Sequence, residues 1–386
     1  MANESNCGPQ PVPEIKRIQM EIVCYNKYSD LDAIEYAWNQ LGEQGLYFVP
    51  SFSELRYQLK ASGAQFRLLV ATDDSQIKAI ACFTYGKATK YYGIASWKLF
   101  DLPMQKVTLF GSCVLGEPSE SLVRRFFHHA IKGSNFDLID VGEIFIDSPL
   151  YKAVTSLSGL VIAWRGSRKN RLWWLIRMPG SFDEYFASLR EKTRAHIVRD
   201  CHKFERENPD FRVMQRPEEV EFFLRDAEKI SRLTYQWKFG QGVHNDENTR
   251  QKLMWLAENG ILRCYIVYLR GKPCAFGWGK LSYGKFSFQR TGYDPQYRKL
   301  SPGTSLMIRM IRDLIENTNC KIFDFRWGDE DGYKSRLGNV SVGCASVRVA
   351  KIYRPYSLLI ILLDQTLNLA KNLIGLIIER GPLRYG

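Results

Sequence analysis

The sequence lacks the motifs that mark several large classes of enzyme. It has only five histidines in 386 residues, and none of them has the spacing of a zinc protease or a catalytic triad. Its nine cysteines include no Cys-x-x-Cys pair, so the sequence predicts neither a structural zinc site nor a disulfide framework. No Walker-type loop and no Gly-x-Gly-x-x-Gly segment occur. We therefore predict no metal ligands and no permanently bound cofactor.

The N-terminal segment lacks the apolar core of a secretory signal. Residues 1–17 are polar and interrupted by prolines, and Ala2 excludes the myristoylation pattern. We expect a disordered tail there. The scattered cysteines fit a reducing, cytoplasmic compartment.

The composition is that of a globular protein with a strong positive charge. Hydrophobic residues make up 45% of the chain and aromatic residues 13%, which is enough for packed cores, and the length favours two domains. The net charge of +13 favours acidic partners: nucleotides, acyl-carrier proteins, nucleic acid or anionic membranes. Charge alone does not choose among them.

The two halves of the chain show the same order of expected elements. Each has a helix-rich start, a meander of strands, a Pro/Gly corner, a helix and an apolar strand that carries Asp. The corner at 115–122 corresponds to the corner at 300–306, and Gly142 to Gly328. We interpret this order as a duplication, with a coincidence of ordinary α/β architecture as the alternative. The sequence thus predicts an α/β (α+β) fold of two tandem domains, each a mixed, mostly antiparallel sheet flanked by helices.

A break at residues 179–181 separates the two expected domains. We place the N-terminal domain at residues 18–178, the C-terminal domain at 179–350, and an amphipathic helix with a tail at 351–386. The polar residues of this last helix fall on one face. We expect its apolar face to close over a groove in the protein, and peripheral attachment to a membrane interface is the alternative.

A strongly basic run follows the break. We interpret it as an amphipathic helix with solvated charges, and a nucleic-acid patch is the less favoured alternative. The run contains Arg190, Lys192, Arg194, His196, Arg199, His202, Lys203 and Arg206.

The stretch from Tyr293 to Gly338 carries the strongest functional signal. A Pro/Gly corner opens a helix of helical apolar period, and the start of a helix favours an anion because its backbone N–H groups and its dipole point outward. A strand over 321–327 and a polar cluster follow. We predict that the corner holds the diphosphate of coenzyme A or the phosphate of a carrier-protein arm, through Arg298, Ser301, Pro302, Gly303, Thr304 and Ser305.

This stretch resembles the acetyltransferase group associated with cellulose and exopolysaccharide biosynthesis, within the GNAT superfamily. That group is similar to the Fem-type transferases, which pair two GNAT-like domains, so the resemblance implies that both predicted domains are GNAT-like. Two features differ from the usual pattern of the superfamily. The corner has one glycine where the usual basic-x-x-Gly-x-Gly loop has two, and two residues, Asp331 and Gly332, separate Gly328-Asp329-Glu330 from Tyr333-Lys334 where one is usual. The motifs that carry the resemblance are Gly292-Tyr293-Asp294-Pro295, Ser301-Pro302-Gly303, Asp324-Phe325, Gly328-Asp329-Glu330, Tyr333-Lys334 and Gly338.

The resemblance implies direct acyl transfer from a bound thioester to an acceptor. Asp329 or Glu330 is then the candidate general base, Tyr333 the candidate acid and Lys334 a candidate anion contact. A solvated loop with a turn at Gly332 is the alternative for this cluster.

Four residues are candidates for the acceptor site. Gln289 and Arg290 lie on the last strand of the second meander, where ordinary sheet surface is the alternative. Trp237 lies in a loop that mixes aromatic residues with glycines, and His244 follows it near Asp246. A helix end with packed aromatic residues is the alternative for that loop.

The sequence thus favours an N-acyltransferase that uses acyl-CoA or an acyl-carrier protein and a small amine, hydroxyl or sugar acceptor. Polysaccharide or secondary-metabolite biosynthesis is the expected setting. A Fem-type transferase that uses aminoacyl-tRNA and a non-catalytic, membrane-associated binding protein are the alternatives.

Overall fold

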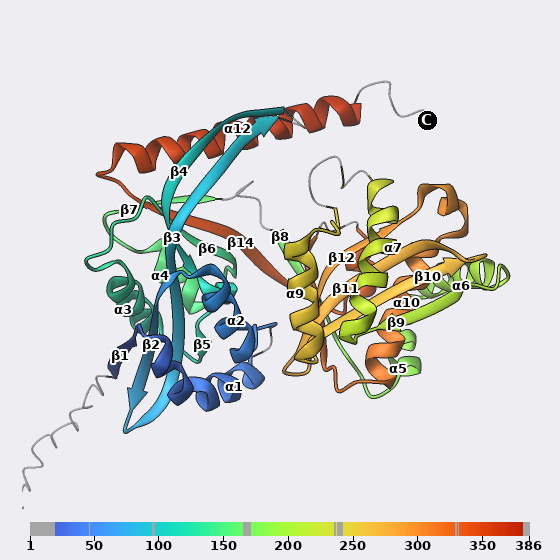
Figure 1. Cartoon of the computed structure of the whole chain (residues 1–386), viewed down its shortest axis with the longest axis horizontal. Helices are drawn as coiled ribbons and strands as arrows, with labels where there is room; N and C mark the ends of the chain where they lie inside the picture. The colour runs from blue at the N-terminus through green and yellow to red at the C-terminus, as the bar shows by residue number, and fades with distance from the viewer. Residues whose placement is uncertain are drawn as a thin grey trace, which may run out of the picture.

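A computed structural model of the chain describes residues 20–45, 47–94, 97–164, 171–234, 237, 242–328, 330 and 332–380. In this part of the chain, one continuous sheet of fourteen strands runs through both halves of the protein (Figure 1). Helices cover both faces of the sheet in each half. The order of the strands is β1-β2-β3-β4-β6-β14-β8-β13-β12-β11-β10-β9, with β5 paired to β3 and β7 paired to β14.

The N-terminal half contains an antiparallel meander followed by a crossover helix. One face of its sheet packs against the first helices and the other against α3 and α4, so apolar residues on both faces are buried. The strands are β1 (Glu21–Tyr25), β2 (Gln65–Asp73), β3 (Gln76–Ile94), β4 (Trp97–Leu109), β5 (Leu115–Gly116), β6 (Leu138–Phe145) and β7 (Leu160–Trp164). The helices are η1 (Tyr28–Ile34), α1 (Glu35–Gln44), α2 (Phe52–Ser62), η2 (Phe110–Ser112), α3 (Glu120–Ile131) and α4 (Pro149–Thr155).

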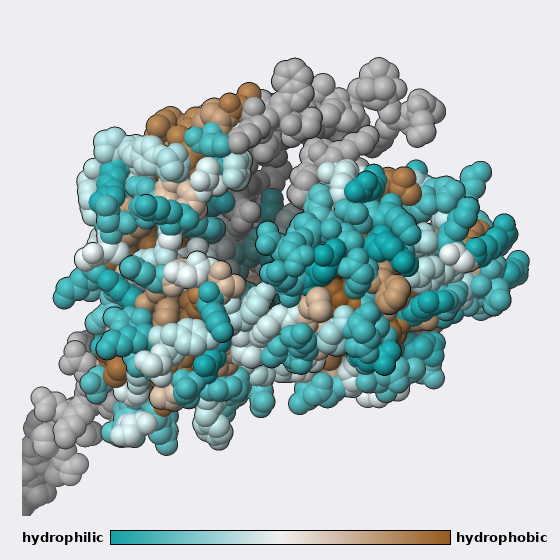
Figure 2. All heavy atoms as spheres, in the orientation of Figure 1, coloured by the Kyte–Doolittle hydropathy of each residue, from teal (hydrophilic) through white to brown (hydrophobic). Residues whose placement is uncertain are grey.

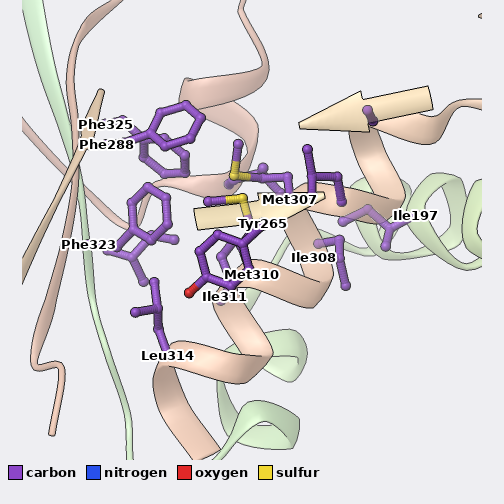
Figure 3. Packing of buried hydrophobic residues seen from close by; sticks show 14 of the residues in the cluster. Ile197, Tyr265, Phe288, Met307, Ile308, Met310, Ile311, Leu314, Phe323 and Phe325 are labelled. Atoms are coloured by element: carbon purple, nitrogen blue, oxygen red, sulfur yellow. The ribbon is translucent and has the colours of Figure 1, made fainter. Parts of the chain in front are cut away.

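The C-terminal half repeats this plan. Its main core lies between the sheet and α10, where aromatic residues of β12 and β13 meet Met307, Met310 and Leu314 (Figure 3). The strands are β8 (Arg171–Arg177), β9 (Asp210–Met214), β10 (Leu262–Leu269), β11 (Lys272–Ser282), β12 (Lys285–Tyr293), β13 (Ile322–Gly328) and β14 (Val340–Lys351). The helices are α5 (Phe182–Ser188), α6 (Glu191–Glu205), η3 (Pro217–Glu219), α7 (Val220–Arg232), α9 (Glu247–Glu258), η4 (Pro295–Leu300), α10 (Pro302–Glu316), α11 (Tyr333–Leu337) and α12 (Pro355–Arg380).

The register of the sheet supports the duplication. In the N-terminal half, β4 pairs in parallel with β6 over three residues, ending with Thr108 opposite Asp140. In the C-terminal half, β12 pairs in parallel with β13 over three residues, ending with Ser287 opposite Asp324. The crossover helix α3 connects β4 to β6, and α10 connects β12 to β13 in the same way. The predicted α/β architecture, a mixed and mostly antiparallel sheet flanked by helices, is confirmed, and the two copies of the plan share one sheet.

One detail of the predicted correspondence is wrong. Because Asp140 and Asp324 hold the same register position, Gly142 corresponds to Arg326 and not to Gly328. Both residues have a positive φ, 82° at Gly142 and 62° at Arg326. An arginine rarely adopts this backbone conformation, so the C-terminal copy holds a strained turn that the N-terminal copy makes with glycine.

The strands around the proposed domain boundary pair across it. β8 lies before residue 179 in the sequence, yet it pairs with β13 of the C-terminal half. β14 lies at the end of the C-terminal range, pairs with β8 at its start, and then pairs with β6 and β7 of the N-terminal half. Figure 1 shows β14 spanning the two halves. We keep residue 178 as a proposed boundary along the sequence. In space, the strand pairing joins the two halves into one sheet.

The β11–β12 hairpin also joins the halves. The Nζ of Lys280 lies 2.6 Å from Oε1 of Glu54 in α2, and only 12% of the lysine side chain and 2% of the glutamate side chain are exposed. The Nζ of Lys285 donates to the carbonyl oxygen of Gly42 at 2.6 Å, and burial lowers its pKa to about 8. The hydroxyl of Tyr283 accepts a hydrogen bond from the Phe52 amide.

We expect the substitution Lys280→Ala to destabilise the protein by about 3–5 kcal/mol, because it leaves the buried Glu54 carboxylate without its cation. Urea unfolding followed by circular dichroism would measure this loss. Arg124→Ala removes a pair whose side chains are 47% and 36% exposed, and it should cost less than about 1 kcal/mol. Equal losses in the two variants would contradict the expectation.

The aromatic segment at 91–102 has no regular alternation, and its described residues belong to a long arm that β3 and β4 form. α12 lies along this arm, but its polar side chains turn inward: Asp364 pairs with Lys90 and Arg348. The expectation that only an apolar face would contact the protein is therefore corrected. Among the described residues, no helix has the length and apolarity needed to cross a bilayer.

Candidate active site

A cavity of about 1210 Å³ opens between α6 and α10, at the end of β12. Its wall is basic, because four of its lining residues are permanently charged cations, and His196 lies among them. Its apolar lining includes Ile197, Met307 and Leu337, which pack into the core drawn in Figure 3. No Asp or Glu occurs among the described residues that line it. The four cations are Arg190, Lys192, Arg199 and Arg336.

The start of α10 forms one end of the cavity. Ser301 adopts the left-handed conformation, and its side chain makes no capping hydrogen bond. The amides of Thr304 and Ser305 both donate to the carbonyl oxygen of Ser301, and Pro302 has no N–H. Within the described chain, Gly303 is thus the first-turn residue whose amide has no acceptor, and it lines the cavity. One amide, the helix dipole and the basic wall together suit a phosphate.

The corresponding corner of the N-terminal half is closed. The Ser119 hydroxyl accepts from the Leu122 amide and caps α3, and Glu120 places an acid in the first turn. Gly116, in β5, pairs with β3 so closely that an added Cβ would lie 2.1 Å from the carbonyl oxygen of Lys78. A capped, acidic and covered helix start disfavours a phosphate. Of the two copies, the second therefore has the open anion site.

β12 and β13 separate beside the cavity. Their pairing ends at Ser287 and Asp324, and within the described chain the later residues of β12 have no partner on β13. Trp278 pairs with Arg290 and Gly279 pairs with Phe288, so Gln289 is an extra residue, a β-bulge, at this point. Separated strand edges leave backbone N–H and C=O groups for a ligand. The end of β12, Thr291 to Tyr293, lines the cavity directly.

Asp324 lies where the two strands separate. Its side chain is on the face opposite α10, and the residue is 1% exposed. Its Oδ1 accepts from the Trp173 indole at 2.7 Å and from the Arg326 amide at 2.7 Å. Burial raises the pKa of Asp324 to about 6, although these hydrogen bonds and the charges of Arg326 and Lys334 oppose the rise. A carboxylate with this pKa is suited to accept a proton near neutral pH.

The corresponding carboxylate of the N-terminal half is neutralised. Asp140 lies 2.7 Å from the Nζ of Lys106, which occupies the same register position as Lys285 in the other copy. Lys285 instead donates to Gly42, and within the described chain Asp324 has no cation within ion-pair distance. The second copy therefore holds both the open anion site and the carboxylate with a raised pKa.

The predicted catalytic residues lie close to the cavity where they are described. Tyr333 begins α11, lines the cavity and makes an edge-on contact with Phe325. The Nζ of Lys334 donates to the carbonyl oxygens of Phe325 and Trp327, so this side chain fixes the end of β13. Glu330 is exposed, and Asp329 lies outside the described residues.

The predicted donor-binding residues divide into two groups. Gly303 and Thr304 line the cavity. Pro302 and Ser305 are buried in the first turn of α10 and are not among the lining residues, and neither are Arg298 and Ser301 just before it. Since Gly303 has no side chain, Thr304 is the one predicted donor-binding residue whose side chain can face the cavity.

The predicted acceptor residues form two separate pairs. The rings of Trp237 and His244 lie 4.2 Å apart, and the Trp237 amide donates to Thr234, which lines the cavity. Gln289 donates to the Ser287 hydroxyl at 2.9 Å, on the Asp324 side of the sheet. Arg290 follows it, and burial together with the nearby Arg326 lowers the pKa of Arg290.

Sequence reasoning missed two parts of this site. The basic run was interpreted as solvated, but Arg190, Lys192, His196 and Arg199 of that run line the cavity. Their spacing of about one helical turn was a signal that they share a face. Asp324 was noted as part of a motif and was not assigned a role. Its place in an apolar strand, directly after Ile322 and Phe323, would have suggested burial.

Comparison with known proteins agrees with this geometry. Residues 191–335 match the family model described as Acetyltransferase (GNAT) domain. The match begins with α6 and ends within α11, so it includes the residues that line the cavity except Arg190, Arg336 and Leu337. No curated protein gave a significant match in sequence.

Solved structures show the same fold over most of the chain. The crystal structure of FemX is similar with a TM-score of 0.60 at 10% identity, over 89% of this chain and 100% of that one. A tandem GNAT protein from the clavulanic acid biosynthesis pathway is similar with a TM-score of 0.47 at 12% identity, over 86% of this chain and 98% of that one. The likeness to FemX shows that this chain has the FemX fold, and the GNAT family match lies within it at residues 191–335.

Proposed function

We propose that the protein is an N-acyltransferase that moves an acyl group from a coenzyme A or carrier-protein thioester to an amine. The observation that carries the proposal is the basic cavity beside the separated strands, with a buried carboxylate of raised pKa on the other side of the sheet. The cations suit phosphates, and the apolar residues Ile197, Met307 and Leu337 suit a pantetheine arm and its acyl chain.

In the proposed reaction, the acceptor amine attacks the carbonyl carbon of the thioester, a C–N bond forms and the C–S bond breaks. The backbone edge of β12 polarises the carbonyl. A carboxylate takes the proton of the amine, and Tyr333 gives a proton to the leaving thiolate. We propose Asp324 as the base. Asp329 or Glu330, in the acidic turn after β13, is the second candidate.

The acceptor enters, on this proposal, from the side of the sheet opposite the cavity. Ser287, Gln289 and Arg326 surround Asp324 there, and Glu143 of the N-terminal half pairs with Arg326 at 3.1 Å. The aromatic rings of Tyr47, Phe145 and Trp173 pack beside them. We propose that the N-terminal half shapes the acceptor site, with an amine, hydroxyl or sugar as the acceptor. The setting in polysaccharide or secondary-metabolite biosynthesis rests on the sequence resemblance.

A reducing, cytoplasmic location is part of the proposal. The eight described cysteines are all free thiols. Burial and the nearby Cys113 raise the pKa of Cys82, yet the two cysteines do not form a disulfide.

A Fem-type transferase that uses aminoacyl-tRNA is the second candidate. The exposed outer residues His202, Lys203 and Arg206 of the basic run favour it, because they extend the positive charge of α6 beyond the cavity.

Isothermal titration calorimetry with coenzyme A tests the donor class. We expect binding at micromolar concentration, weakened by ADP as a competitor, because the phosphates supply much of the attraction. Total tRNA serves as the comparison ligand. Binding of tRNA without binding of coenzyme A would favour the second candidate, and the absence of both would leave a non-catalytic binding protein.

A further inference from the structure

α12 exposes its apolar side and buries polar side chains. Leu359, Leu362 and Leu369 follow one face of the helix and are 44%, 61% and 62% exposed. On the opposite face, Ser357 is fully buried and Asp364 is 8% exposed. Figure 2 shows hydrophobic residues gathered along the upper edge of the molecule, where α12 lies in Figure 1. A surface helix normally has the reverse arrangement.

The inward face of α12 is fixed by specific contacts. Asp364 forms ion pairs with Lys90 of β3 and Arg348 of β14, and all three side chains are at least four-fifths buried. The hydroxyl of Tyr92 donates to the carbonyl oxygen of Ile360 at 3.2 Å, and that of Tyr356 donates to Pro103. Turning the leucines inward would move Asp364 away from Lys90 and Arg348 and break both buried ion pairs. The exposed leucines are therefore a property of the folded state.

Aromatic and basic residues surround the leucines. Phe100 of the arm is 40% exposed and stacks on Tyr92, and Tyr353 and Tyr356 at the start of the helix are 68% and 38% exposed. Tyrosines with an apolar ring and a polar hydroxyl are typical of the headgroup region of a bilayer. The arm and the adjoining parts of β14 and α12, residues 86–109 and 347–370, contain seven basic residues and two acidic ones. Lys90, Lys106, Arg348 and Arg354 form ion pairs within the protein, and Lys87 of the arm is exposed.

We propose that the outer face of α12, with the adjacent arm, binds the surface of an anionic membrane. The leucines enter the boundary between headgroups and acyl chains, and Lys87 together with the net charge of +13 attracts anionic lipids. Because the other side of the helix is held to the sheet, α12 lies parallel to the membrane and does not cross it. The excess of basic over acidic residues around the leucines would disfavour a second copy of this face.

Vesicle co-sedimentation of the full chain tests this proposal. We expect binding to vesicles with about 30 mol % phosphatidylglycerol in phosphatidylcholine, and much weaker binding to phosphatidylcholine alone. The double variant L362Q/L369Q should lower the partition coefficient at least thirtyfold, because both leucines leave water on binding. Both side chains are largely exposed, so circular dichroism should show unchanged folding.

The matched control is the double variant F222Q/L233Q, which removes two residues of similar exposure, 54% and 55%, from the C-terminal half. It should bind as the wild type does. No binding of the wild type to anionic vesicles, or equal loss in the two double variants, would overturn the proposal. Light scattering that showed a dimer abolished by L362Q/L369Q would also overturn it, because a second copy would then cover this face. None of these outcomes depends on the proposed transferase activity.

Discussion

The substitution Asp324→Asn should lower kcat by about 10²- to 10³-fold while the protein becomes more stable. The first effect follows if Asp324 takes the proton of the acceptor amine, since removal of a general base typically costs this much. Wild-type kcat/KM should rise with pH through about 6, the pKa of Asp324, and this limb should be absent in the variant.

The second effect follows from the sign of the pKa change. Burial raises the pKa of Asp324 from 3.8 to about 6, so ionisation costs the folded state free energy that the unfolded state does not lose. Wild-type stability should therefore fall as the pH rises from about 4 to about 6 and then stay reduced. Asparagine can still accept from Trp173 and Arg326 but cannot ionise, so the variant should gain up to about 3 kcal/mol at pH 7.

The paired variant D329N/E330Q distinguishes the two candidate bases. If Asp324 is the base, this variant should keep a kcat within about tenfold of wild type and retain the limb near pH 6. Loss of turnover in D329N/E330Q with normal turnover in D324N would assign the base to the acidic turn. Unchanged turnover in both variants would remove every proposed carboxylate from the mechanism.

The double variant K192A/R199A should weaken donor binding by about 10²-fold. Both side chains line the basic cavity, and each charge-assisted contact to a phosphate contributes about 1.5–3 kcal/mol. We expect the donor KM to rise and kcat to change little, because phosphate contacts are made equally in the ground state and the transition state. Steady-state kinetics with acyl-CoA would measure both constants.

K203A/R206A is the matched control, since it removes two exposed cations of the same basic run that are not among the lining residues of the cavity. It should change the donor KM by less than about threefold. An aminoacyl-tRNA donor would contact a longer surface, so both double variants would then weaken binding by similar factors, with a steep dependence on salt. Equal effects of the two variants on acyl-CoA would contradict the proposed donor site.

Much of the second half was predictable because its elements are local. The apolar period of α10, the corner before it and the alternation of β10, β11 and β12 each depend on residues close in sequence. The duplication was predictable as well, because the order of the elements along the chain is the same in both halves. The β3–β4 arm could not be predicted, because its strands contact each other beyond the sheet core, where alternation of polar and apolar residues is weak.

The site was only partly predictable because its parts come from distant segments. The cavity joins α6, the start of α10, the end of β12 and α11, and no local pattern states that α6 covers the corner before α10. The pKa of Asp324 depends on Trp173, which is 151 residues away in the sequence, and on packing between the halves. Burial of this kind is a property of the assembled sheet.

By itself, the sequence determined the GNAT-like order of elements, the Pro/Gly corner at Gly303 and the basic charge of α6, because periodicity, turn chemistry and charge are local properties. Only the tertiary structure decided which crossover helix has an open N-terminus, α3 or α10. It also decided which carboxylate has a raised pKa and which face of α12 meets solvent. Those outcomes depend on contacts such as Lys106 with Asp140 and Lys90 with Asp364. Long-range ion pairs and burial set the ionisation and exposure of side chains, and neither can be computed from neighbours in the chain.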